Sequence, residues 1–299
     1  MKFRLVLVIL FVTLCAARAG ASEARPLTLA VLDMGGSPTA ERVAERLSKV
    51  VGSIVRTDGR VTLLDRGMSR AAARGVGYAG SLNMTLAEAR ALGAAVGCDF
   101  FITGDAQTLR RSSSTRPVYY ESYATLFFVS AQTGRLAFWL RPTAEADTAE
   151  SAETALLDKF TATVFGPYVG IVAETAEREE RERFSSDEGA GAAVIDLSTD
   201  EGAASNKDLR EPAPYRRLRP AYTDAAARAE AEATVDAVVE IGADGVVADV
   251  RVVRWAGFDL DQEVVATVKR MHFRPAQRDG EPVAVRVLLR YNFRKPPKS

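Results

Sequence analysis

The stretch that decides the fold lies at residues 234–293 and reads TVDAVVEIGADGVVADVRVVRWAGFDLDQEVVATVKRMHFRPAQRDGEPVAVRVLLRYNF. Apolar and polar residues alternate from Thr234 to Ile241 and again from Val246 to Trp255, and the loop between them contains two glycines. Alternation is typical of a half-buried strand, and two such runs joined by a short glycine loop predict an antiparallel hairpin.

A helix and a third strand follow the hairpin. Apolar residues recur at helical spacing from Leu260 to Met271, and Pro275 cannot continue the helix. After the Asp279–Gly280 turn, the last run places Val283, Val285, Val287, Leu289, Tyr291 and Phe293 on one face and Arg286, Arg290 and Arg294 on the other. With a short helical segment at 225–231, residues 215–299 predict a small three-stranded antiparallel sheet with two helices.

The order of these elements resembles the C-terminal domain of the TonB family. The features that carry the resemblance are the DG turn at 244–245, the helix entry AGFDLDQ at 256–262, FRPA at 273–276 and DGEPV at 279–283. In that family the domain captures a short extended peptide of an outer-membrane receptor along an unpaired strand edge, through backbone hydrogen bonds. The resemblance therefore implies binding by strand addition.

The last strand, residues 283–293, is the candidate edge. The partner-binding residues that we expect on it are Val283, Val285, Arg286, Val287, Leu288, Leu289, Arg290, Tyr291 and Phe293. Arg286 and Arg290 favour an acidic partner. The alternative is a solvated polar face that keeps an edge strand from aggregating.

Residues 26–183 alternate between strand and helix patterns and end with a hairpin. Strand patterns occupy 27–32, 61–64, 100–104, 119–130 and 136–140. Ser37–Pro38 suits a helix start, Thr85 with Glu88 makes a capping box, and 148–183 has a helical pattern. This order predicts an α/β unit with a mixed sheet.

Several segments of this unit resemble the envelope module shared by CsgG-like lipoproteins and the amino-terminal domain of TolB-type proteins. They are TLAVLDMGG at 28–36, VTLLDRG at 61–67, ALGAAVGCDFFITGDAQ at 91–107 and ATLFFVSAQTGRLAF at 124–138. The resemblance implies a binding or assembly domain without chemistry. Residues 184–214, rich in Ser, Gly, Ala and Asp, predict a flexible linker in which only 193–197 is apolar enough to dock.

The first residues have the pattern of a secretory signal peptide. Lys2 and Arg4 precede an apolar run from Leu5 to Val12, and small residues surround a cleavage point after Ala21. The run is shorter than the roughly 20 residues of a membrane span. We therefore expect a signal at 1–21, no stable membrane span after cleavage and a location in the periplasm of a Gram-negative bacterium. The alternative is an uncleaved anchor, which would suit a TonB-type energy transducer.

Composition restricts the function classes. The chain has 39 basic and 39 acidic residues, one histidine and two cysteines in 299 residues. A balanced charge argues against nucleic acid as a partner, and so few His and Cys residues exclude multi-residue zinc sites and a disulfide framework. A catalytic histidine could only be His272. We expect no catalytic residue, no cofactor and no metal.

The expected function is a non-enzymatic periplasmic adaptor for an outer-membrane or periplasmic protein. A homo-oligomer stays open as a further form of the protein. A less favoured alternative is a hydrolase that uses the strand-end carboxylates of Asp33, Asp65 and Asp105.

Overall fold

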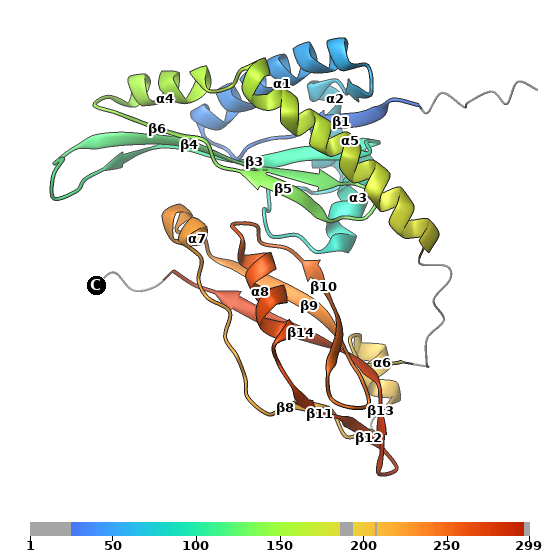
Figure 1. Ribbon diagram of the computed structural model, residues 1–299. Coiled ribbons are helices and arrows are strands. Elements are labelled where there is room, and N and C mark those ends of the chain that lie inside the picture. The colour runs from blue at the N-terminus through green and yellow to red at the C-terminus, as the bar shows by residue number, and fades with distance from the viewer. Residues whose placement is uncertain (1–24, 186–193, 207, 296–299) are drawn as a thin grey trace, which may run out of the picture.

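The computed structural model describes residues 25–185, 194–206 and 208–295, in which the chain forms two main sheets (Figure 1). We refer to residues 25–185 as the N-terminal unit and to residues 194–295 as the C-terminal unit. The predicted signal at 1–21 lies outside the described residues. No helix within the described ranges combines the length and the apolar character that crossing a membrane requires.

The sheet of the N-terminal unit is mixed, as the sequence predicts. Its path is β2–β1–β3–β4–β5, and β6 also pairs with β4. The β1 strand runs parallel to β2 and β3, whereas the β3–β4, β4–β5 and β4–β6 pairs are antiparallel. The strands are β1 (Leu27–Val31), β2 (Val61–Leu63), β3 (Phe100–Arg111), β4 (Tyr119–Ser130), β5 (Leu136–Leu140) and β6 (Thr143–Ala146).

Helices cover both faces of this sheet. Side chains of α1 (Pro38–Asp58), α4 (Ala149–Asp158) and α5 (Ala162–Ser185) share a core with one face. Side chains of α2 (Arg66–Gly75) and α3 (Leu86–Val96) join the other core, which also includes the C-terminal unit. Successive strand residues point to opposite faces, so Phe127 and Phe128 belong to different cores.

Two helix starts that the sequence predicts follow the capping rules. The Ser37 hydroxyl accepts a hydrogen bond from the Ala40 amide at 3.0 Å, and the Thr85–Glu88 capping box is present. The α2 helix was not among the expected elements; Asp65 caps it by accepting from the Met68 amide at 2.8 Å. The residues that this helix buries, Ser69 and Ala73, are small, so it lacks a stripe of large apolar side chains.

The sheet of the C-terminal unit has the order β10–β9–β14–β7. Its antiparallel core is β9 (Ala233–Ile241), β10 (Val247–Arg254) and β14 (Val285–Phe293), with α8 (Leu260–Lys269) packed on one face. Val235, Ala237, Val239 and Ile241 are fully buried, as their alternation predicts. The remaining short elements are β7 (Ile195–Asp196), α6 (Asp200–Ser205), β8 (Ala213–Pro214), α7 (Asp224–Ala229), β11 (Phe273–Arg274), β12 (Ala276–Arg278) and β13 (Glu281–Val283).

Three of these short elements lie in the segment 184–214, for which composition predicts a flexible linker. They are β7, α6 and β8. The predicted last strand is also divided, since Val283 belongs to β13, which pairs with β12, and β14 begins at Val285. Elements of two or three residues are too short for an alternating pattern to reveal them.

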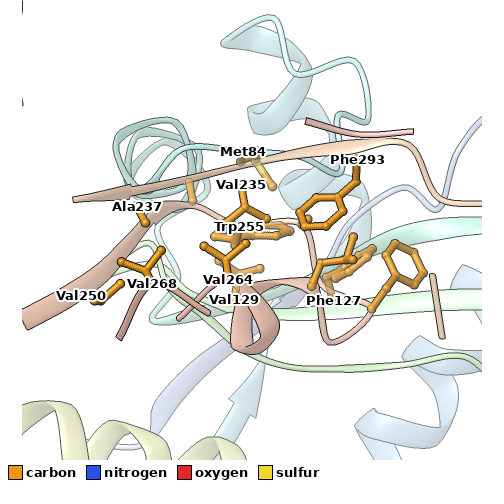
Figure 2. Close-up of a cluster of buried hydrophobic side chains, with 14 of the residues drawn as sticks. Met84, Phe127, Val129, Val235, Ala237, Val250, Trp255, Val264, Val268 and Phe293 are labelled. Atoms are coloured by element: carbon orange, nitrogen blue, oxygen red, sulfur yellow. The ribbon is translucent and has the colours of Figure 1, made fainter. Parts of the chain in front are cut away.

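The two units share a core, which Figure 2 shows around Trp255. The Trp255 ring lies 5.6 Å from that of Phe127 on β4, and its indole Nε1 donates to the Gly134 carbonyl oxygen at 3.0 Å. Asn83 bridges the units by donating to the carbonyl oxygens of Thr234 at 2.8 Å and Trp255 at 2.6 Å. Apolar packing and satisfied polar groups therefore join the units.

Candidate partner-binding edge

The outer side of β14 is the candidate site. Its inner side pairs with β9 from Val285 to Phe293, whereas its outer side pairs with β7 only at Val285 and Arg286. Within the described ranges, no strand pairs with the outer side from Val287 to Phe293. An unpaired edge of this kind offers free backbone donors and acceptors.

The β7 strand shows which residues of β14 face outwards. The amide of Ile195 donates to the Ala284 carbonyl at 3.1 Å, and the amide of Leu197 donates to the Arg286 carbonyl at 2.7 Å. Backbone groups alternate in direction along a strand. The N–H and C=O groups of Leu288, Arg290 and Asn292 therefore point away from β9, along the unpaired part of the edge.

The side chains of β14 divide between two faces. Val285 and Phe293 are buried, and Val287, Leu289 and Tyr291 are half-buried against the core that the units share. The opposite face carries Arg286, Leu288 and Arg290, of which Leu288 is 39% exposed. Val283, the remaining predicted site residue, pairs with Ala276 in the β12–β13 ladder and lies just before the edge.

Arg290 forms a paired contact with Asp236 on β9. Its Nε lies 2.7 Å from Oδ1 and its Nη2 lies 2.9 Å from Oδ2, and Arg254 Nε lies 3.3 Å from the same Oδ2. Burial raises the pKa of Asp236, but the hydrogen bonds and charges of Arg290 and Arg254 outweigh it, so the pKa is below its usual range. The Arg290 side chain is 57% exposed and stays accessible from outside.

Arg286 lies between two carboxylates of the chain itself. Its Nη2 donates to Glu240 Oε2 at 3.0 Å, and its Nη1 lies 3.6 Å from Asp196 Oδ2 on β7. Hydrogen bonds from Ser198 chiefly lower the pKa of Asp196; burial opposes this shift, and Arg286 adds to it. A partner carboxylate at Arg286 or Arg290 would share the arginine with an internal carboxylate.

The three carboxylates of the enzyme alternative have structural partners. Asp33 lies within 3.6 Å of the guanidinium groups of Arg66, Arg70 and Arg74. Asp65 caps α2, and Asp105 accepts from the Tyr123 hydroxyl at 2.7 Å.

No group of three or more His, Cys, Asp or Glu residues in the described part of the chain is arranged to hold a metal ion. His272 is exposed.

Sequence reasoning missed the β7–β14 ladder and the Asp236–Arg290 pair. The apolar residues Ile195 and Leu197 were the only sequence signal for the β7–β14 ladder, because a strand of two residues has no measurable period. Opposite charges on two predicted strands were a signal for the second, but pairing them needs the strand register.

Comparison with known proteins finds a family match and several similar solved structures. Residues 219–294 match the sequence model of the family described as Gram-negative bacterial TonB protein C-terminal. The solution NMR structure of the Pseudomonas aeruginosa TonB CTD is 21% identical over 36% of this chain and 100% of that chain, with a TM-score of 0.27. No curated protein matches the chain.

Two further solved structures are similar over a larger share of the chain. A PelC dodecamer from Paraburkholderia phytofirmans is 13% identical over 48% of this chain and 88% of that chain, with a TM-score of 0.27. The LpoB C-terminal domain from Salmonella enterica is 16% identical over 42% of this chain and 86% of that chain, with a TM-score of 0.27. The family match thus covers one part of the protein: residues 219–294 match the sequence model of the TonB C-terminal family.

Proposed function

We propose that this protein is a non-enzymatic adaptor of the Gram-negative cell envelope, which binds an extended segment of an outer-membrane or periplasmic protein along β14. The observation that carries the proposal is the outer side of β14, which has no strand partner among the described residues from Val287 to Phe293. Such an edge binds an extended backbone of any sequence, and the neighbouring side chains select among them.

The short β7 strand supports the proposal, because it is itself an added strand on this edge. Two backbone hydrogen bonds, from Ile195 and Leu197, hold it at the start of β14. A partner strand would extend the same ladder along Leu288, Arg290 and Asn292. Leu288 and Arg290 project from the face that a partner side chain would contact, so an apolar residue and an acidic residue at alternate positions would suit it.

In this proposal the N-terminal unit presents the TonB-like unit to its partner. The domain division is a signal at 1–21, an α/β envelope domain at 26–183, a connecting segment at 184–214 and the TonB-like domain at 215–299. The resemblance of the α/β domain to the CsgG-like and TolB module favours an assembly role in the envelope. Export by the signal would locate the mature protein in the periplasm.

Site-specific photocrosslinking in the cell envelope tests the proposal. A photoreactive phenylalanine analogue replaces Leu288 in one variant and Met68 in the control, where the native side chain is 75% exposed on α2. We expect a crosslink to an outer-membrane or periplasmic protein from position 288 that position 68 does not give. Equal crosslinking from both positions, or none from 288, would contradict the proposal.

Two proline variants separate backbone pairing from contact with the Leu288 side chain. Leu288→Pro removes an outward N–H that has no partner on β9, so the domain should stay folded while a crosslink from a neighbouring position disappears. Leu288→Ala should keep that crosslink, since the backbone is unchanged. Leu289→Pro removes a hydrogen bond to β9 and should unfold the domain, which checks the assignment of directions along β14.

A further inference from the structure

A second pair of strand edges borders a groove between the two units. The groove has a volume of about 640 Å³, and its walls are β5 of the N-terminal unit and β10 and α8 of the C-terminal unit. Both strands are terminal in the path of their sheets, so each has an outer side to which no strand of the described residues pairs along the groove. The groove is separate from β14, which lies on the far side of β9.

The groove runs along the backbone edges of these strands. Residues 135–139 of β5 and its turn line it without a gap, as do residues 250–252 of β10. Side chains of consecutive strand residues point to opposite faces of a sheet, so a groove on one face would be lined by every second residue. A run of consecutive lining residues therefore means that the groove follows the backbone edge of the strand.

The hydrogen-bond pattern gives the direction of the backbone groups on β5. The amides of Ala124 and Ser130 donate to the carbonyls of Pro142 at 3.1 Å and Arg135 at 3.0 Å. Even-numbered residues of β4 therefore bond towards β5, and Trp139, which stands opposite Phe127, directs its N–H and C=O away from β4.

The same reasoning applies to β10. The backbone groups of the even-numbered residues of β14 point away from β9, so the odd-numbered residues of β14 bond to β9. Their partners on β9 are also odd-numbered. The even-numbered residues of β9 therefore bond to β10. Val238 pairs with Arg251, which leaves the N–H and C=O of Val250 and Val252 facing outwards. Free backbone groups thus point outwards from both walls.

One end of the β10 edge already accepts an extended segment. The Trp255 amide donates to the Met84 carbonyl at 3.2 Å, and Thr85 forms an antiparallel bridge with Arg254. Leu86, the next residue, lines the groove. The groove therefore begins where this internal pairing ends, and a bound strand would continue it.

The walls are apolar and the rim is cationic. Leu136, Trp139, Val252 and Val265 are half-buried beside the shared core and line the groove. Three cations stand among the lining residues: Arg135, Arg251 and Lys269.

Two of the three rim cations have ion-pair partners that a bound carboxylate would have to replace. Arg135 pairs with Glu182 at 2.8 Å and Arg251 with Asp249 at 3.3 Å, and all four side chains are about half exposed, so these pairs are weak. The single carboxylate of the lining, that of Asp261, accepts from the amides of Ala256 and Gly257 at 2.8 Å each.

We propose that this groove binds an extended acidic peptide segment of another protein, whose backbone pairs with the edges of β5 and β10. Its apolar residues lie against Trp139 and Val265, and its carboxylates lie at Arg251 and Lys269. Backbone groups on both walls favour a peptide over an anionic lipid, because a lipid chain leaves those groups unpaired. The site does not depend on β14 and goes beyond the function proposed above.

A peptide titration with the full exported chain tests this site. The probe is a fluorescein-labelled peptide of alternating Glu and Val residues, followed by fluorescence anisotropy. The comparison peptides are the same length with Lys in place of Glu, and the Glu peptide with alternate backbone amides methylated. We expect the Glu peptide to bind more tightly than either, because the first control reverses the charge and the second removes donors.

Protein variants locate the binding. Arg251→Glu with Lys269→Glu should weaken the Glu peptide by about tenfold or more. Arg46→Glu with Lys49→Glu makes the same charge change at exposed positions on α1 and should leave the affinity unchanged. Leu288→Pro should also leave it unchanged, which separates this site from β14.

Three results would overturn the proposal. They are equal binding of the Glu and Lys peptides, an equal effect of the two charge-reversal variants, and unimpaired binding of the methylated peptide. Displacement of the Glu peptide by oleate, together with unimpaired binding of the methylated peptide, would identify the groove as a site for anionic amphiphiles instead.

Discussion

The carboxylate of Asp236 on β9 and the guanidinium of Arg290 on β14 make two parallel contacts across the strands, at 2.7 and 2.9 Å. The Asp236 side chain is 4% exposed, whereas that of Arg290 is 57% exposed. The pair thus joins a buried acceptor to an accessible cation on the edge strand that we propose as the binding site. It orients Arg290 without withdrawing it from a partner.

Asp236→Asn should destabilise the C-terminal unit. The amide keeps one acceptor but loses the charge that two arginines contact, so we expect a loss of about 1–3 kcal/mol in the free energy of unfolding. Urea unfolding measures this change. Asp249→Asn is the matched control, because it removes an exposed carboxylate beside Arg251 and should change stability by less than about 0.5 kcal/mol. Equal losses of stability in the two variants would show that the buried Asp236–Arg290 pair contributes no more than an exposed ion pair.

The stability that Asp236 contributes should depend on pH in acid. The pKa of Asp236 is lowered in the folded protein, so the unfolded state binds a proton first as the pH falls. The contribution is complete above the unfolded pKa of about 4 and is lost as the pH falls through the folded value. The difference in unfolding free energy between the wild type and Asp236→Asn should therefore shrink below about pH 4. A difference that grows in acid would contradict the lowered pKa.

Asp261 should change the stability of the protein with pH in the opposite direction. Burial raises its pKa to about 6, although the amides of Ala256 and Gly257 favour the charged form. The folded state therefore holds the proton longer than the unfolded state, and this residue makes the protein less stable as the pH rises from about 4 to about 6. NMR titration of the Asp261 carboxyl carbon measures the midpoint. A midpoint at or below about 4, the value for an unfolded chain, would show that the two amide donors outweigh burial.

Ile195→Pro should release β7 from β14. Proline has no N–H, so the hydrogen bond from residue 195 to Ala284 is lost. We expect faster amide hydrogen exchange at Arg286, which faces β7, and unchanged exchange at Val287, which faces β9. Ile195→Val keeps the amide and should leave both rates unchanged. If partner crosslinking from position 288 also rises, β7 competes with the partner for the edge.

The hairpin and the last strand could be predicted because apolar and polar residues alternate along each strand. The fully buried Val235, Ala237, Val239 and Ile241 are the letters that alternate in the sequence. The α2 helix was harder to predict, because the residues that it buries, Ser69 and Ala73, are small. Its arginines at every fourth position pair with Asp33, and no large apolar side chain marks the buried face.

Sequence patterns could not predict the core that the two units share, for another reason. The apolar residues around Phe127 and Trp255 predict that these side chains are buried, but they do not predict which residues pack against them. The TonB-like resemblance predicted an edge strand at 283–293, because family order carries topology, and the structure has that strand at Val285–Phe293. The groove between β5 and β10 depends on how two units pack, and neither unit contains that information by itself.

The contact between the units gives the last prediction. Asn83 donates to the carbonyls of Thr234 and Trp255 and accepts from the Thr234 amide at 3.0 Å, so one side chain satisfies three backbone groups of the C-terminal unit. Asn83→Ala leaves those groups without their partner and should cost about 2–4 kcal/mol at the interface.

The readout is the cooperativity of unfolding. The wild type should unfold in one transition that fluorescence of the buried Trp255 and far-ultraviolet circular dichroism report together. In Asn83→Ala the fluorescence transition should precede the loss of secondary structure, because the units separate before they unfold. Asn206→Ala is the control, since the Asn206 side chain bonds to Gly202 and Arg278, which both belong to the C-terminal unit. Coincident transitions in Asn83→Ala would mean that the apolar contacts of Trp255 with Phe127 suffice to keep the units together. The groove between the units would then persist without the Asn83 hydrogen bonds.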